Sequence, residues 1–164
     1  MFEFSLVQKI IIWAIPVLFA ITVHEVAHGW VALKLGDRTA QMLGRLTLNP
    51  FKHIDPIGTV LVPGLLLLLG GFVFGWAKPV PVSYQNLHQP KRDMAWVAAA
   101  GPAANFIMAI IWAIVAKLGL MLIHADITLG QPMMFMGVAG VLINTMLMML
   151  NLLPIPPLDG SRVL

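Results

Sequence analysis

Four long apolar stretches constrain this chain more than any other feature. They cover residues 10–33, 57–77, 94–123 and 133–153 of a 164-residue sequence. As an α-helix, the first stretch of about 24 residues would extend roughly 36 Å, which is enough to cross the hydrocarbon core of a bilayer. Charged residues make up only 10% of the chain, against about 25% in a soluble domain. These features exclude a water-soluble enzyme and predict an all-α, multi-pass protein of the cell membrane, with residues 1–164 forming a single membrane-embedded domain.

The distribution of basic residues favours three crossings rather than four. If residues 57–77 enter the bilayer and return, seven basic residues fall on one side of the membrane. They are Lys34, Arg38, Arg45, Lys52, Lys78, Lys91 and Arg92. Positive charge concentrates on the cytoplasmic side, so residues 34–93 are predicted to be cytoplasmic. The prolines and glycines within 57–77 suit a re-entrant segment, although a fourth spanning helix stays open as an alternative.

The same basic residues do not indicate a nucleic-acid partner. They are scattered at the ends of apolar runs, which is the pattern of topology determinants, although the sequence pI is about 9.6. Two short pieces of the predicted cytoplasmic region look extended. Residues 45–48 alternate polar and apolar side chains, and Pro79-Val80-Pro81-Val82 cannot be helical. The sequence therefore predicts a small extended or β element near the cytoplasmic face.

The first apolar stretch contains the motif His24-Glu25-Val26-Ala27-His28. Histidines four residues apart project from one face of a helix at the spacing needed to hold one metal ion. The glutamate beside the first histidine is placed to act as a general base on a water molecule rather than as a ligand. Ionisable groups are costly inside a membrane segment, so their presence here indicates function. If Leu33 marks the cytoplasmic end, the two histidines lie roughly 8 and 14 Å inside it, so we expect the metal below the membrane surface.

A catalytic zinc ion needs a third protein ligand. Asp159 stands out among the candidates, which are Asp37, Asp55, Asp93, Asp126, Asp159, His53, His88 and His124. Three prolines after the last apolar stretch force the helix to stop near Leu153, and the extended segment they hold could re-enter the protein interior. From the local sequence alone, Asp159 is either this ligand or the N-cap of a following helix.

Together these motifs resemble the site-2 proteases, a family of intramembrane zinc metalloproteases. The resemblance rests on HEVAH in the first stretch, on GPAANF at residues 101–106 and on NLLPIPPLDG at residues 151–160. The segments GRLTLNPFKHIDPIGT (residues 44–59) and FGWAKPVPV (residues 74–82) are similar to the minimal subgroup without a PDZ domain. Members of this family usually continue past the LDG element, so we expect this sequence to be truncated at its C-terminus.

The resemblance implies one zinc ion per chain, bound by His24, His28 and Asp159, with Glu25 as the general base. It also implies that Asn105 and Asn151 bind the substrate, although packing between helices would explain Asn105 and a helix C-cap would explain Asn151. The implied activity is hydrolysis of a peptide bond in or near the transmembrane segment of a membrane-protein substrate. Substrate and lipid bilayer are the expected partners.

A membrane metal-ion transporter is the alternative function. Intramembrane His, Glu and Asp side chains can form a transport site, and Glu25 would then be a metal ligand.

Overall fold

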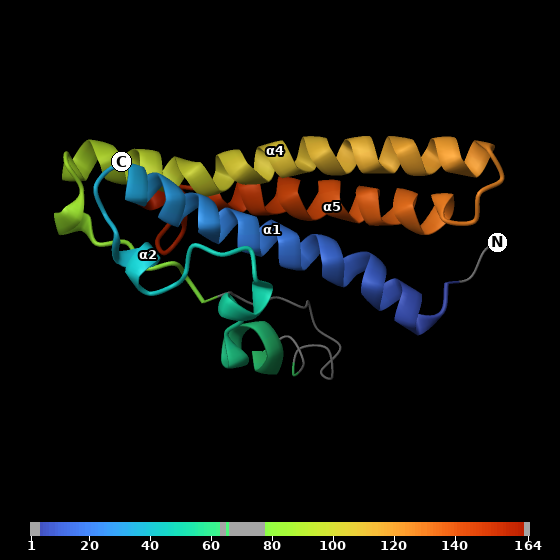
Figure 1. Ribbon diagram of the computed structural model, residues 1–164, viewed down its shortest axis with the longest axis horizontal. Coiled ribbons are helices and arrows are strands. Elements are labelled where there is room, and N and C mark those ends of the chain that lie inside the picture. The colour runs from blue at the N-terminus through green and yellow to red at the C-terminus, as the bar shows by residue number, and fades with distance from the viewer. Residues whose placement is uncertain (1–3, 63–64, 66–77, 163–164) are drawn as a thin grey trace.

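Three long helices make up most of the molecule. The computed structural model describes residues 4–62, 65 and 78–162. Helices α1 (Leu6–Lys34), α4 (Pro90–His124) and α5 (Gly130–Asn151) lie along one another (Figure 1). Among these described residues, five short helical elements connect or follow them: α2 (Thr39–Met42), η1 (Pro50–Lys52), η2 (Pro56–Leu61), η3 (Tyr84–Asn86) and η4 (Asp159–Arg162).

All three long helices are long and apolar enough to cross a membrane. Their outward faces stay apolar: Ile107, Ile110 and Ile114 of α4 are each about half exposed. In water such a surface would be strongly unfavourable, whereas in lipid the hydrocarbon covers it. The prediction of an all-α protein is confirmed in this coarse form: the regular structure of the described residues is helical and includes three helices that could span a membrane.

Helices α4 and α5 pack backbone to backbone through glycine. A Cβ atom added at Gly137 would lie 2.4 Å from the Ala116 nitrogen, and one at Gly119 would lie 2.4 Å from the Met134 nitrogen. Lipid supplies no hydrophobic drive for helices to associate, so close backbone approach and dispersion contacts stabilise the pair. These glycines therefore set the distance between the two helices.

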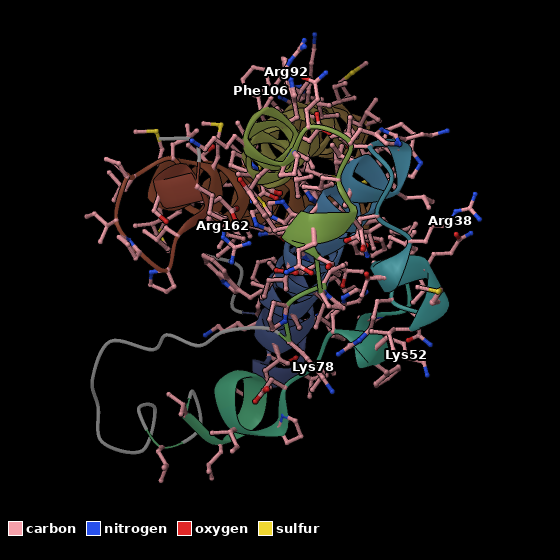
Figure 2. All side chains as sticks on the ribbon, turned by 90° about the vertical axis from the view of Figure 1, so that its left-hand side faces the viewer. Arg38, Lys52, Lys78, Arg92, Phe106 and Arg162 are labelled. Atoms are coloured by element: carbon pink, nitrogen blue, oxygen red, sulfur yellow. The ribbon has the colours of Figure 1, made fainter. Side chains whose placement is uncertain are left out.

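Helix α4 begins at the same end of the bundle where α1 ends (Figure 1). The backbone N–H of His88, just before α4, donates to the carbonyl of Leu35, just after α1, at 3.0 Å. The end of α1 and the start of α4 thus lie at the same end of the bundle. Most of the predicted re-entrant stretch 57–77 lies outside the described residues. Figure 2 views the molecule from this end, where Arg38 and Arg92 point outward.

The predicted β element is not observed in the described part of the chain, which contains no strand. Both pieces expected to be extended lie over α1: a Cβ atom at Gly29 would come within 2.6 Å of Leu46 and 2.8 Å of Val80. Pro79 and Pro81 have no N–H, and the N–H of Val80 donates to the Glu25 side chain at 2.7 Å. Since these donors are missing or occupied, this segment cannot form a regular ladder.

Replacing Gly137 with alanine tests the close packing of α4 and α5. The added methyl group would collide with backbone atoms that cannot move independently, so we expect a destabilisation of about 1–3 kcal/mol. Thermal unfolding in detergent micelles measures this effect. The control is Val138→Ala, at a position that is 44% exposed, and it should leave the unfolding temperature almost unchanged. Equal unfolding temperatures for both variants would contradict this packing.

Candidate metal centre

Two histidines of α1 face α4 across a glycine. His24 and His28 are each only 7% exposed, and their Nε2 atoms lie 3.0 Å apart. A Cβ atom added at Gly101 would come within 2.4 Å of His28 Nε2 and 2.5 Å of His24 Cε1. The absence of a side chain at Gly101 therefore creates the space that both imidazole rings occupy.

The chain returns to these rings after α5. Gly160, the residue after Asp159, approaches the end of α5 so closely that a Cβ atom would lie 2.5 Å from the carbonyl oxygen of Leu153. This tight return places Asp159 Oδ2 3.2 Å from His24 Nε2 and 3.1 Å from His28 Nε2. The predicted ligand carboxylate thus lies beside both predicted ligand imidazoles.

These three atoms suit a zinc ion. Two ligands bound tetrahedrally to zinc at about 2.0–2.2 Å would lie about 3.3–3.6 Å apart, and the observed separations are 3.0–3.2 Å. Asp159 Oδ2 is also buried without a hydrogen-bond donor among the described residues. Such an atom is costly unless a cation or a donor satisfies it. Within the described part of the chain, His24, His28 and Asp159 form the one cluster with ligand atoms this close.

The pKa of the Asp159 carboxyl group lies below its usual range. Burial alone would raise this pKa, but the neighbouring His24 and His28 side chains outweigh burial. An ionised carboxylate is the form that ligates a metal ion.

The other ring nitrogen of each histidine contacts α4. His28 Nδ1 donates to the backbone carbonyl of Val97 at 2.7 Å. His24 Nδ1 lies 3.2 Å from Nδ2 of Asn105, a side chain with no exposed surface. Contacts with α4 at Nδ1 therefore fix the orientation of both rings, as is usual for histidines that bind a metal through the other nitrogen.

Glu25 contacts the segment around Val80. Its Oε2 accepts the hydrogen bond from the Val80 N–H at 2.7 Å, and Glu25 is not part of the described ligand cluster. The segment around Val80 thus fixes the position of this carboxylate, which belongs to the residue after His24. No side-chain pattern in the sequence indicates a contact made by a backbone N–H.

Asp37 anchors the segment that follows Val80, a structural role that the sequence did not indicate. Its carboxylate accepts hydrogen bonds from the N–H of Ser83 at 2.7 Å and from the side chain of Asn86 at 3.0 Å, and also from Thr39. Burial would raise the pKa of Asp37, but these hydrogen bonds outweigh it and lower the pKa. Asp37 therefore ties residues 83–86 to the end of α1, with Val80 three residues away.

The remaining candidate ligands lie in other surroundings. His53 is buried with Nε2 2.9 Å from the carbonyl of Thr47, and Asp55 caps the start of η2. Asp93 accepts from the N–H of Gln89 at the start of α4. Three lie elsewhere: His88 before α4, and His124 and Asp126 at the far end of α4.

Asn151, predicted to bind substrate, is the last residue of α5. Its Nδ2 donates to the Leu147 carbonyl of its own helix at 3.0 Å, and the side chain is half-buried. Its role in substrate binding stays a prediction.

A HExxH helix and a distant carboxylate that converge in this way define a metallohydrolase centre set among membrane helices. Residues 12–133 match the family model described as peptidase family M50. The chain therefore belongs to peptidase family M50, the site-2 proteases, and the resemblance inferred from its motifs is confirmed.

The chain is similar to several named proteins. It is 40% identical to "Putative zinc metalloprotease YwhC" of Bacillus subtilis over 92% of this chain and 66% of that protein. It is 34% identical to "Putative zinc metalloprotease Rip2" of Mycolicibacterium smegmatis, over 90% of this chain and 53% of that protein. It is 26% identical to "Zinc metalloprotease MJ0392" of Methanocaldococcus jannaschii, over 98% of this chain and 36% of that protein. The chain thus spans between about a third and two thirds of these relatives' lengths. No solved structure gives a significant match.

Replacing Gly101 with alanine tests the space between α4 and the two imidazoles. The methyl group would displace both rings from their present positions, so we expect the variant to lose stoichiometric zinc. Elemental analysis of purified protein measures the zinc content. Ala103→Ser, at an exposed position of the same helix, is the control and should retain one zinc ion per chain. A full zinc complement in Gly101→Ala would contradict this geometry.

Proposed function

We propose that this chain is the catalytic core of a zinc-dependent intramembrane endopeptidase. The observation that carries the proposal is the convergence of His24, His28 and Asp159 between membrane-length helices, with Glu25 held alongside. The names of the related proteins also support zinc as the metal. The substrate class proposed is a membrane protein cleaved in or near its transmembrane segment.

His24, His28 and Asp159 would hold the zinc ion. When bound, zinc supplies a positive charge that polarises a peptide carbonyl and makes a nearby water easier to deprotonate. Glu25 would accept the proton of the attacking water and then deliver it to the leaving nitrogen. The hydrogen bond from the Val80 N–H would keep the Glu25 carboxylate in place between these two transfers.

The position of Glu25 favours a protease over a metal transporter. In a transport site the glutamate would be expected among the ligands, but its carboxylate is bound to the Val80 N–H instead.

We propose that the active site lies within the bilayer, towards its cytoplasmic side. Lys34 at the end of α1, Lys91 and Arg92 at the start of α4, and Arg162 after α5 occupy one end of the bundle. This concentration of basic residues supports a cytoplasmic orientation of that end. His28 lies six residues before the end of α1, or about 9 Å along the helix axis.

A helical substrate must unwind before cleavage, because its own hydrogen bonds shield its peptide bonds. Because Pro79 and Pro81 have no N–H and the Val80 N–H is bound to Glu25, an unwound segment could hydrogen-bond to the backbone of residues 79–81 only through their carbonyl groups. Substrates with Gly, Pro or Asn in the transmembrane helix should be preferred, since unwinding costs less there.

The variant Glu25→Gln tests the role of the proposed base. It should retain one zinc ion per chain, because the ligands are unchanged, while cleavage falls about 10²–10⁴-fold. Elemental analysis and cleavage of a model transmembrane substrate in detergent measure both quantities. His24→Ala is the reference variant and should lose zinc and activity together. Loss of metal binding in Glu25→Gln would instead support the transporter.

The variant Val80→Pro tests the hydrogen bond to Glu25, because proline has no N–H. Hydrogen bonds to charged groups contribute about 1.5–3 kcal/mol, so we expect kcat to fall about 10- to 100-fold with zinc content unchanged. Val80→Ala is the matched control, since it removes the side chain but keeps the N–H. Equal kcat values for the two variants would show that the Val80 N–H does not hold Glu25.

A further inference from the structure

We propose that Asn105 is a positioning residue for zinc: its side-chain carbonyl accepts a hydrogen bond from His24 Nδ1–H and so keeps His24 Nε2 free to bind the metal. This inference rests on the proposed zinc site. It differs from the substrate-binding role that the family resemblance implies for Asn105.

The first argument is the location of the side chain. Asn105 lies on α4, one helical turn after Gly101, and its amide nitrogen is 3.2 Å from His24 Nδ1. It has no exposed surface. It contacts the ring nitrogen opposite the one that faces Asp159. A fully buried group in this place can affect the orientation and the proton position of the His24 ring, because that ring is what it contacts.

The second argument comes from His28. The partner of its Nδ1 is the Val97 carbonyl oxygen, which can only accept a hydrogen bond. His28 Nδ1 therefore carries the proton, and Nε2 presents its lone pair towards the other ligand atoms. A neutral His24 that binds the same ion needs the same arrangement, with an acceptor at Nδ1. The amide of Asn105 is the group in contact there.

The third argument concerns the orientation of this amide. Half a turn about the last side-chain bond exchanges its oxygen and nitrogen. With Nδ2 facing the ring, the amide donates to His24 Nδ1, the ring proton must sit on Nε2, and ligation is blocked. In that orientation Asn105 Oδ1 is also buried without a partner among the described residues. Zinc binding therefore selects the rotated orientation, in which Oδ1 accepts from Nδ1–H.

The choice of residue fits the membrane setting. A carboxylate in the same place would orient the ring equally well, but it would add a second buried negative charge on the other side of His24 from Asp159. An amide oxygen orients the ring without adding charge inside the bilayer, where ionised groups are costly.

The experiment compares zinc affinity in the full chain, purified in detergent, for wild type and three variants. Asn105→Leu keeps the approximate volume but removes the acceptor. Asn105→Asp keeps an acceptor of the same size. Asn144→Leu is the matched control, since Asn144 is equally buried but its amide donates to the Gly140 carbonyl of its own helix rather than to a histidine. Competition with a chromophoric chelator gives each zinc dissociation constant, and the absorption spectrum of the cobalt(II)-substituted protein reports the ligand set.

We expect Asn105→Leu to weaken zinc binding about 10- to 100-fold. Asn105→Asp and Asn144→Leu should stay near the wild-type value, with the wild-type cobalt spectrum retained. If Asn105→Leu binds zinc as tightly as wild type, the inference is wrong. It is also wrong if Asn105→Asp is weakened as much as Asn105→Leu, because packing rather than hydrogen-bond acceptance would then explain the loss.

Two further outcomes are equally decisive. If Asn105→Leu does not fold, the comparison of Asn105→Asp with wild type decides, since a retained affinity supports the acceptor role and a lost affinity overturns it. If the wild-type chain itself binds no zinc, the proposed function fails and this inference fails with it. Zinc binding that is identical in wild type and all folded variants overturns the inference alone.

Discussion

The mutual approach of three ligand atoms organises this structure. His24 Nε2, His28 Nε2 and Asp159 Oδ2 lie 3.0–3.2 Å from one another. Lone pairs this close repel unless a proton or a cation lies between them, and in a buried site the repulsion is weakly screened. The site is therefore built around a positive charge. Holding it together requires α1, α4 and the segment after α5 to keep their relative positions, and the rest of the fold serves that requirement.

Glycine residues make this arrangement possible at two helix interfaces. Between α4 and α5, glycines bring backbones into contact where lipid gives helices no other reason to pack tightly. Between α1 and α4, Gly101 leaves room for two imidazole rings instead of for a neighbouring backbone. Glycine thus lets the α4 and α5 backbones touch, whereas between α1 and α4 it leaves space for side chains. Outside the bundle, Asp37 fixes the position of residue 83 through a hydrogen bond, and the Val80 N–H in the same segment fixes the Glu25 carboxylate.

The sequence predicted the long helices and the meeting of two histidines because both depend on local or strongly restrictive patterns. Apolar length predicted three helices long enough to span a membrane, and the i, i+4 spacing predicted that His24 and His28 share one helix face. The choice of Asp159 needed the family resemblance, since local sequence fitted an N-cap equally well. The small extended or β element is not observed among the described residues: at residues 79–81, prolines and the hydrogen bond to Glu25 remove the N–H donors that a strand would need. Contacts made by backbone groups, such as those of Val80 and Val97, do not depend on side-chain type, so the sequence pattern does not predict them.

The order of the ligands along the chain has a consequence for biogenesis. Two of them are in α1, whereas Asp159 follows α5. A ribosome inserting this protein into the membrane delivers the histidines and Glu25 early, but the three side chains cannot meet until the segment after α5 has been made. Nascent chains that end before this segment therefore lack one corner of the cluster, and its assembly is delayed until α1, α4 and α5 are all in place.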